Sequence, residues 1–197
     1  MSPALGEGSH TFDVRATDAA GNTDSSPATN TWTVDLTAPD TTIDTNPADP
    51  SNDTTPSFSF SSSETGSTFE CRIDSGSWAA CSSPETIASA LSEGSHTFRV
   101  RATDTAGNTD GTPASYTWTV DLTAPNTTID SSPADPSNDT TPSFSFSSSE
   151  SGSTFECRVD GGSWTPCASP ETVSPALGAG SHTFDVRATD AAGNTDG

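Results

Sequence analysis

A motif of 17 residues occurs three times in this chain, at intervals of 86 residues. It reads Gly-Ser-His-Thr-Phe-x-Val-Arg-Ala-Thr-Asp-x-Ala-Gly-Asn-Thr-Asp, and its copies begin at Gly8, Gly94 and Gly180. Around it, residues 39–111 and 125–197 are identical at 57 of 73 aligned positions. A period of this length is too long for a single helical repeat and has the size of one small domain. The sequence therefore predicts a tandem array of similar domains.

The period also predicts where the domains begin and end. We expect residues 1–38 to be a partial unit with only its last two strands, residues 39–124 to be a complete unit, and residues 125–197 to be a unit that lacks its last strand. We do not expect a segment as short as the first to fold around a core of its own. Either it pairs with another surface, or the chain is an excerpt of a longer array.

Within the complete unit, apolar and polar residues alternate with a period of two, as in half-buried strands, and no helical period is present. Seven short antiparallel strands separated by turns predict an all-β fold, made of tandem seven-stranded antiparallel β-sandwiches of the Ig-like or fibronectin III-like kind. The expected strands are residues 41–43, 57–61, 68–73, 78–81, 85–91, 97–102 and 116–120.

The charge of the chain argues against two classes of partner. Asp and Glu total 27 against six basic residues, and the formal net charge is -21. Nucleic acids and anionic membranes attract positively charged surfaces, so we expect neither as a partner. No apolar stretch approaches the roughly 20 residues that span a bilayer, so no membrane insertion is expected. Cations remain possible ligands.

Each of the two longer units contains one cysteine pair with a spacing of ten residues across a predicted hairpin. Cys71 and Cys81 form the first pair, and Cys157 and Cys167 form the second. Neighbouring strands bring such residues to the separation that a disulfide requires, and neither pair has the further ligands of a zinc site. We predict two disulfides, which place the chain in an oxidising compartment, extracellular or at the cell surface.

Four short runs characterise the complete unit: Ser-Asn-Asp-Thr-Thr-Pro-Ser-Phe-Ser-Phe from Ser51, Gly-Ser-Thr-Phe from Gly66, Leu-x-x-Gly-Ser-His-Thr-Phe from Leu91, and Ala-Thr-Asp-x-Ala-Gly-Asn from Ala102. These runs resemble the bacterial immunoglobulin-like repeats that occur in tandem in surface adhesins and secreted multidomain proteins. The resemblance implies a β-sandwich that serves as a stalk, a spacer or a ligand-binding tip. The cysteine hairpin is a departure from the commonest form of these repeats.

The three histidines of the motif do not indicate an enzyme. His10, His96 and His182 each follow a Gly-Ser turn, with no partner acid at a fixed spacing. A catalytic nucleophile, base and acid require mutual hydrogen-bond geometry. We therefore predict no catalytic residues, and expect these histidines to be surface residues at the start of a strand.

Acidic residues from a linker and two loops are expected to meet at one end of each sandwich. The strand order places the turn after the second strand and the loop after the sixth at the end where the linker enters. Oxygen ligands of this kind suit Ca²⁺, whereas Asp-x-Ala-Gly-Asn also satisfies plain turn chemistry without an ion. No other cofactor is required. The two hypothetical calcium sites are Asp35, Glu64 and Asp104 at one junction, and Asp121, Glu150 and Asp190 at the next.

Two further features suggest surface chemistry. Asn52, Asn126 and Asn138 fit the acceptor pattern for N-glycosylation. Trp78 and Trp164 follow hairpin turns and are the better candidates for a carbohydrate-binding surface, although packing of each ring over its own strand is the alternative.

Three functions agree with these features. The first is a non-enzymatic structural repeat of an extracellular rod or stalk, as in a surface adhesin, with neighbouring units as its partners. The second is a subunit of an extracellular filament, in which Trp32 and Val34 complete the open sandwich of an identical subunit, head to tail. Residues 2–24 nearly duplicate residues 174–196, so that donor would bring a redundant strand. The third is a displayed module that binds a glycan or protein receptor.

Overall fold

The computed structural model describes residues 4–197, and its regular elements are strands. None of the described residues forms a helix long and apolar enough to cross a membrane. The predicted all-β class is confirmed. The chain separates into two compact units. The first holds residues up to 45 together with residues 58–85 and 97–116, and the second holds residues 46–57, 86–96 and 117–197.

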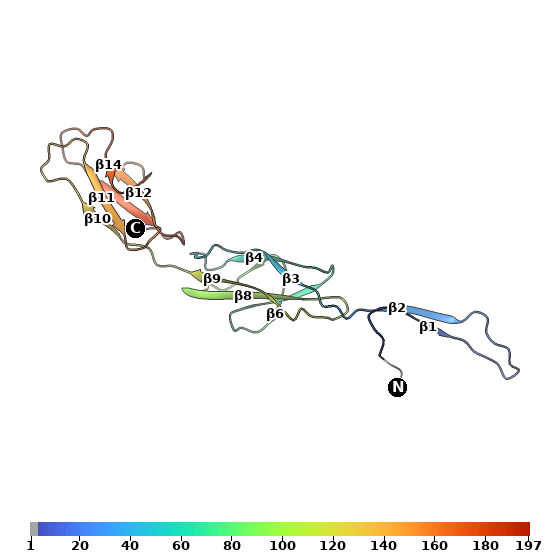
Figure 1. Ribbon diagram of the computed structural model, residues 1–197. Helices are drawn as coiled ribbons and strands as arrows, with labels where there is room; N and C mark the ends of the chain where they lie inside the picture. Colours follow the sequence, from blue (N-terminus) through green and yellow to red (C-terminus); the bar gives the residue numbers. More distant parts are fainter. Residues whose placement is uncertain (1–3) are drawn as a thin grey trace. The chain divides into compact units, whose positions relative to one another are not determined.

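The first unit begins with an antiparallel hairpin of β1 (Gly8–Val14) and β2 (Ala28–Val34), labelled in Figure 1. Gly8 is opposite Val34 in this hairpin, and Val14 is opposite Ala28. Both strands are largely exposed, including Phe12 and Trp32. A two-stranded hairpin of this kind has little core of its own.

Residues 41–120 supply two antiparallel sheets, with strand orders β3-β4-β7 and β6-β5-β8-β9. Within the first unit, the stacked rings of Phe58 and Phe98, 4.2 Å apart, join β4 to β8, and Phe60 packs edge-on against Phe69 of β5. The bounds of these strands are β3 Thr41–Thr45, β4 Ser57–Ser62, β5 Thr68–Ile73, β6 Ala79–Cys81, β7 Glu85–Thr86, β8 Gly94–Thr103 and β9 Ala114–Val120.

Residues 127–189 repeat this pattern within the second unit, with strand orders β10-β11-β14 and β13-β12-β15. Phe144 and Phe184 stack at 4.1 Å as their counterparts do, and Phe146 packs edge-on against Phe155. The bounds are β10 Thr127–Ser131, β11 Ser143–Ser148, β12 Thr154–Val159, β13 Thr165–Cys167, β14 Glu171–Thr172 and β15 Phe184–Thr189.

Two expectations from the sequence are corrected. The strand expected at residues 85–91 is limited to Glu85–Thr86, because single backbone hydrogen bonds from Ile87 to Pro56 and from Leu91 to Thr54 hold the rest of the segment. His96 is not a surface residue: it is only 9% exposed, and its Nε2 donates a hydrogen bond to the Ser92 carbonyl at 2.8 Å.

Candidate metal centre

The first carboxylate of the candidate centre belongs to the loop that follows β8. Asp104 Oδ1 accepts hydrogen bonds from the backbone N–H groups of Ala106, Gly107 and Asn108, at 2.6–2.8 Å. The loop closes through Gly107, whose φ of 97° favours glycine. Burial acts to raise the pKa of Asp104, but the hydrogen bonds outweigh it, and the pKa is lowered. Asp104 is therefore held as a carboxylate.

Asn108 connects this loop to the linker that carries the second carboxylate. Its Nδ2 donates to Asp104 Oδ2 at 2.8 Å and to the backbone carbonyl of Asp35 at 3.1 Å. Asp35 follows the last residue of β2, and its own Oδ1 accepts a hydrogen bond from the backbone N–H of Thr37. One amide group thus fixes the linker to the loop.

The third carboxylate comes from the turn after β4. The backbone N–H of Glu64 donates to Ser62 Oγ, and its carbonyl accepts from Ser67 Oγ, so the turn is closed by its own serines. Partial burial raises the pKa of Glu64, and the negative charges of Asp35, Asp104 and Glu7 raise it further.

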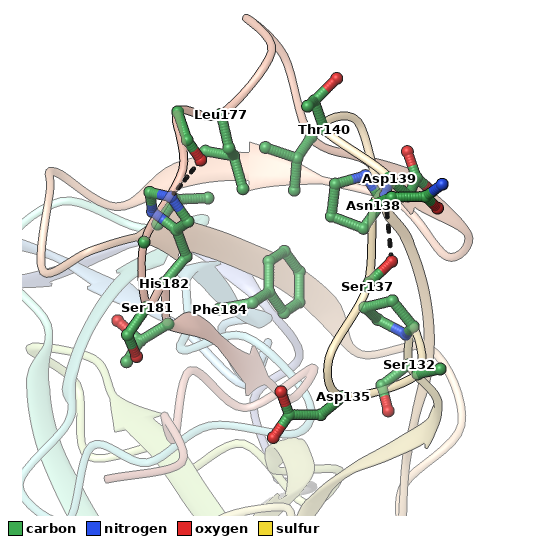
Figure 2. Close-up of a pocket in the computed structure, with 18 of the residues that line it drawn as sticks. Ser132, Asp135, Ser137, Asn138, Asp139, Thr140, Leu177, Ser181, His182 and Phe184 are labelled. Atoms are coloured by element: carbon green, nitrogen blue, oxygen red, sulfur yellow. Dashed lines mark hydrogen bonds between the residues drawn. The ribbon is translucent and has the colours of Figure 1, made fainter.

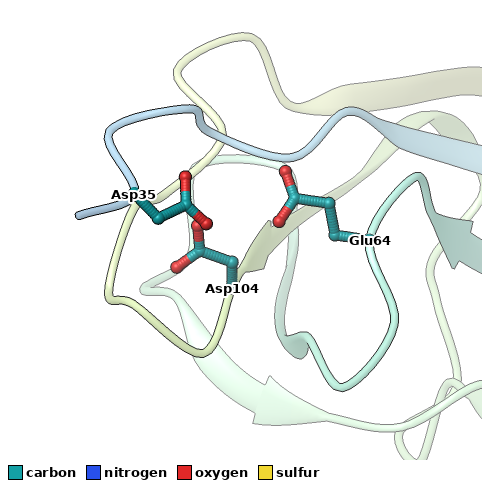
Figure 3. A group of neighbouring side chains, drawn as sticks. All are labelled: Asp35, Glu64 and Asp104. Atoms are coloured by element: carbon teal, nitrogen blue, oxygen red, sulfur yellow. The ribbon is translucent and has the colours of Figure 1, made fainter. Parts of the chain in front are cut away.

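Figure 3 shows the carboxylates of Asp35, Glu64 and Asp104 directed toward one another from three segments of the chain. One oxygen of each lies within 4.8 Å of the other two. Two ligands about 2.4 Å from a shared Ca²⁺ are at most about 4.8 Å apart, so the spacing suits this ion. Without a cation, three like charges at such a distance repel one another.

The same arrangement occurs 86 residues later. Asp121, Glu150 and Asp190 also have carboxylate oxygens within 4.8 Å of one another. Asn194 Nδ2 donates to Asp190 Oδ2 and to the Asp121 carbonyl, both at 2.8 Å. Burial raises the pKa of Glu150, and the charges of Asp121 and Asp190 raise it further. The convergence expected from the strand order is present at both places.

The loop before β4 forms backbone hydrogen bonds with two of the segments that carry the second cluster. The backbone N–H of Asp121 donates to the Ser51 carbonyl at 3.0 Å, and the N–H of Asn52 donates to the Ala192 carbonyl at 3.1 Å. The linker residue and the loop of Asp190 are thus held by the same short segment. No such segment precedes β1 in the described residues.

The clamp formed by Asn108 and Asn194 is the part of the site that sequence reasoning missed. A signal for it is present, because the motif places an asparagine four residues after its aspartate in each copy. The loop of Asp18 confirms the pattern, since Asn22 Nδ2 donates to Asp18 Oδ2 at 2.8 Å. The second acceptor of each asparagine is a backbone carbonyl of the linker, at Asp35 or Asp121, and no sequence pattern near the asparagine indicates it.

The cysteines are paired as predicted. Cys71 is bonded to Cys81 and Cys157 to Cys167, with Cα atoms 5.8 Å apart in each pair. Cys71 and Cys157 are buried. The disulfides therefore join neighbouring strands, β5 to β6 and β12 to β13.

The tryptophans of the hairpins pack against arginines. The guanidinium carbons of Arg72 and Arg101 both lie 4.5 Å from the Trp78 ring centroid, and Trp164 has the same relation to Arg158 and Arg187. Arg101 also forms an ion pair with Glu70 at 2.8 Å. These contacts favour packing of each ring over its own sheet and give no support to a carbohydrate platform.

The predicted glycosylation acceptors lie in three different settings. The Asn52 side chain is next to Gly193, the backbone N–H of Asn126 donates to Ser149 Oγ, and Asn138 is exposed on a loop. Their role as acceptors stays a prediction. Trp32 and Val34, the predicted exchange residues, lie on β2, where they are opposite His10 and Gly8.

Residues 29–123 match the family model described as a bacterial Ig-like domain. This segment is therefore similar to bacterial Ig-like domains. Ig-like domains of this family are generally non-catalytic, and together with disulfides they are typical of extracellular proteins. No curated protein is similar enough to the chain to give a match.

Proposed function

We propose that the chain is a structural part of an extracellular rod or stalk, and that Ca²⁺ bound by the two carboxylate clusters stiffens its junctions. The observation that carries this proposal is the repeated convergence of three carboxylates, one of them from a linker. An ion held by a linker and two loops restricts the linker, because every bond to it fixes one segment against the others.

The donor set favours calcium over other common ions. Each cluster offers up to six carboxylate oxygens and no nitrogen or sulfur, which is a poor set for zinc. Ca²⁺ accepts six to eight oxygen ligands in flexible geometry, with water completing the shell, whereas Mg²⁺ requires a near-ideal octahedron. Burial is the largest cause of the raised pKa values of Glu64 and Glu150, and the neighbouring carboxylates raise them further; a bound cation would relieve this second effect.

Thermal unfolding with Ca²⁺, with Mg²⁺ and with chelator tests the proposal. Ca²⁺ at 100 times its dissociation constant stabilises a one-site protein by about 2.7 kcal/mol. For domains of this size, that corresponds to a rise of roughly 10–20 °C in the midpoint. We expect Ca²⁺ to raise the midpoint and chelator to reverse it.

The matched variants are Glu64→Gln and Glu150→Gln, which keep the shape of the side chain. Glu64→Gln removes one charge from the first cluster only, and Glu150→Gln removes one charge from the second only. Calorimetric titration should show two sites in the parent chain and one in either variant. An unchanged midpoint together with no binding heat would overturn the calcium proposal. Small-angle scattering with and without Ca²⁺ then measures the stiffening itself.

A further inference from the structure

The positive charge of this acidic chain is gathered on two sheet faces. Figure 2 shows a cavity of about 580 Å³ in residues 125–197, with Asp135 and Asp139 on one wall and His182 on the other. None of the described residues that line it is an arginine, so it does not suit an anion. Five of the six arginines lie instead on β5, β8, β12 and β15, at positions that alternate with buried residues and therefore face away from the core.

The two sheets differ at one cross-strand pair. Arg72 of β5 lies opposite Arg99 of β8. At the corresponding positions of the second unit, Arg158 of β12 lies opposite Asp185 of β15. The first copy of the motif also has an aspartate there, Asp13. Arg99 is therefore the exception among the three copies, and it places two like charges side by side on neighbouring strands.

In the second unit, the aspartate satisfies the arginine opposite to it. Arg158 Nε donates a hydrogen bond to Asp185 Oδ2 at 2.9 Å. The Arg158 guanidinium carbon meanwhile lies 4.3 Å from the Trp164 ring centroid. The fold thus accommodates a carboxylate beside an arginine that is stacked on tryptophan.

In the first unit, the arginine has the same place on the ring and lacks the carboxylate. The Arg72 guanidinium carbon lies 4.5 Å from the Trp78 centroid, and its Nε is buried with no hydrogen-bond acceptor among the described residues. Arg99 Nη1 donates only a long hydrogen bond, 3.4 Å, to the Asp74 carbonyl. Within residues 4–197, neither arginine forms an ion pair. An unsatisfied donor and two like charges both cost free energy, and a carboxylate supplied by a ligand would compensate as Asp185 does.

The surroundings indicate what carries this carboxylate. Trp78 is half-buried, and Arg72 and Arg101 both pack on its ring, so the face offers no aromatic or aliphatic anchor of the kind that protein interfaces use. A net charge of -21 repels a densely charged polyanion or a strongly acidic protein surface. A sugar chain with single carboxylates among neutral hydroxyl groups avoids both obstacles. The exposed residues of the adjoining hairpin are small and leave room for it: Ser75, Gly76, Ser77, Ala79 and Ala80.

We propose that Arg72 and Arg99 form a binding site for the uronate units of an extracellular polysaccharide, which they hold by the carboxylate. Planar guanidinium groups form paired hydrogen bonds with a carboxylate, so they fix its orientation as well as its charge. Arg101 is already paired with Glu70 at 2.8 Å and is not one of the ligands. The site goes beyond the rod function and uses none of the residues of the calcium clusters.

Titration of the full chain with trigalacturonate, followed by nuclear magnetic resonance, tests this site. Chelator is present throughout, because carboxylates of the sugar can bind Ca²⁺ themselves. We expect the indole N–H signal of Trp78 to shift, since its ring contacts Arg72, and that of Trp164 to stay. The methyl ester of the same sugar lacks the charge and should leave both signals in place. Equal shifts from the ester and the acid would overturn the role of the carboxylate.

Two reciprocal substitutions are the matched variants, because each introduces a residue that another copy of the motif carries at that position. Arg99→Asp gives the first unit the pair of the second, and it should weaken binding at least about tenfold. Asp185→Arg gives the second unit the pair of the first, and it should create a second site, seen as a new shift of Trp164. Loss of folding cannot imitate such a gain. Thermal midpoints confirm that both variants fold.

Three outcomes would count against the proposal. A parent chain whose Trp78 signal does not respond to the sugar would overturn it, and so would Arg99→Asp binding as tightly as the parent. Equal binding of a triglutamate peptide would overturn the assignment to a sugar. The thermal response to Ca²⁺ is independent of these outcomes, so the two proposals fail separately.

Discussion

Residues 39–111 and 125–197 share most of their sequence, yet they differ in what they bury. Phe98 is 1% exposed and His96 is 9% exposed, whereas their counterparts Phe184 and His182 are half-buried and exposed. The stacked phenylalanine pair is nearly the same in both, at 4.2 and 4.1 Å. Local packing therefore follows the sequence, and burial follows the presence of one additional strand.

The largest loss of stability is expected from removing the indole of Trp118, which is 1% exposed in the complete unit. Trp118→Ala should cost about 3–5 kcal/mol in the free energy of unfolding, because it leaves a large cavity in a closed core. Trp32→Ala should cost less, because Trp32 is 37% exposed on a two-stranded hairpin, where its ring lies 6.0 Å from that of His10 and is not enclosed in a core. Denaturant unfolding followed by circular dichroism measures both. Equal losses would mean that Trp32 is as well enclosed in solution as Trp118.

A smaller effect is expected at the two linker clamps. Asn108→Ala and Asn194→Ala each remove one hydrogen bond to a carboxylate and one to a linker carbonyl, at a cost of about 1–3 kcal/mol. Asp121 keeps its backbone hydrogen bond to Ser51 in the second case. Amide hydrogen exchange should therefore rise more in residues 35–38 of the first variant than in residues 121–124 of the second. Equal increases would show that the Ser51 segment does not brace the junction.

The smallest effect concerns pH and the exposed histidine. His182 Nδ1 lies 2.7 Å from Asp160 Oδ2, and this hydrogen bond raises the pKa of His182. A second hydrogen bond, to the Gly178 carbonyl, raises it further. A group whose pKa is raised by folding stabilises the fold fully below its unfolded pKa, near 6.5, and loses that contribution as pH rises through the folded value. Urea midpoints of the second unit should thus fall modestly as the pH rises above neutrality.

Asp160→Asn is the control for this titration. It keeps a side chain of the same size and removes the charge that favours protonated His182, so the decline above neutrality should become smaller. A decline of the same size in this variant would assign the pH dependence to other groups.

Much of the candidate centre was predictable from the sequence. Strand order alone places a linker, the turn after the second strand and the loop after the sixth at one end, so Asp35, Glu64 and Asp104 were expected together. The spacing of Cys71 and Cys81 across a hairpin was sufficient for the disulfide. The clamp by Asn108 was not predictable, because its second acceptor is a backbone carbonyl 73 residues away, and every residue carries such a group.

By itself, the sequence determined the period, the alternation that makes strands, the disulfides and the ends at which the acids gather. These are local or periodic properties, and each repeat carries its own copy of them. Only the tertiary structure decided which copy of an identical side chain is buried, because burial depends on what lies across the sheet. His96 and His182 occur in the same run of residues, and the presence of β9 beside one of them accounts for the difference.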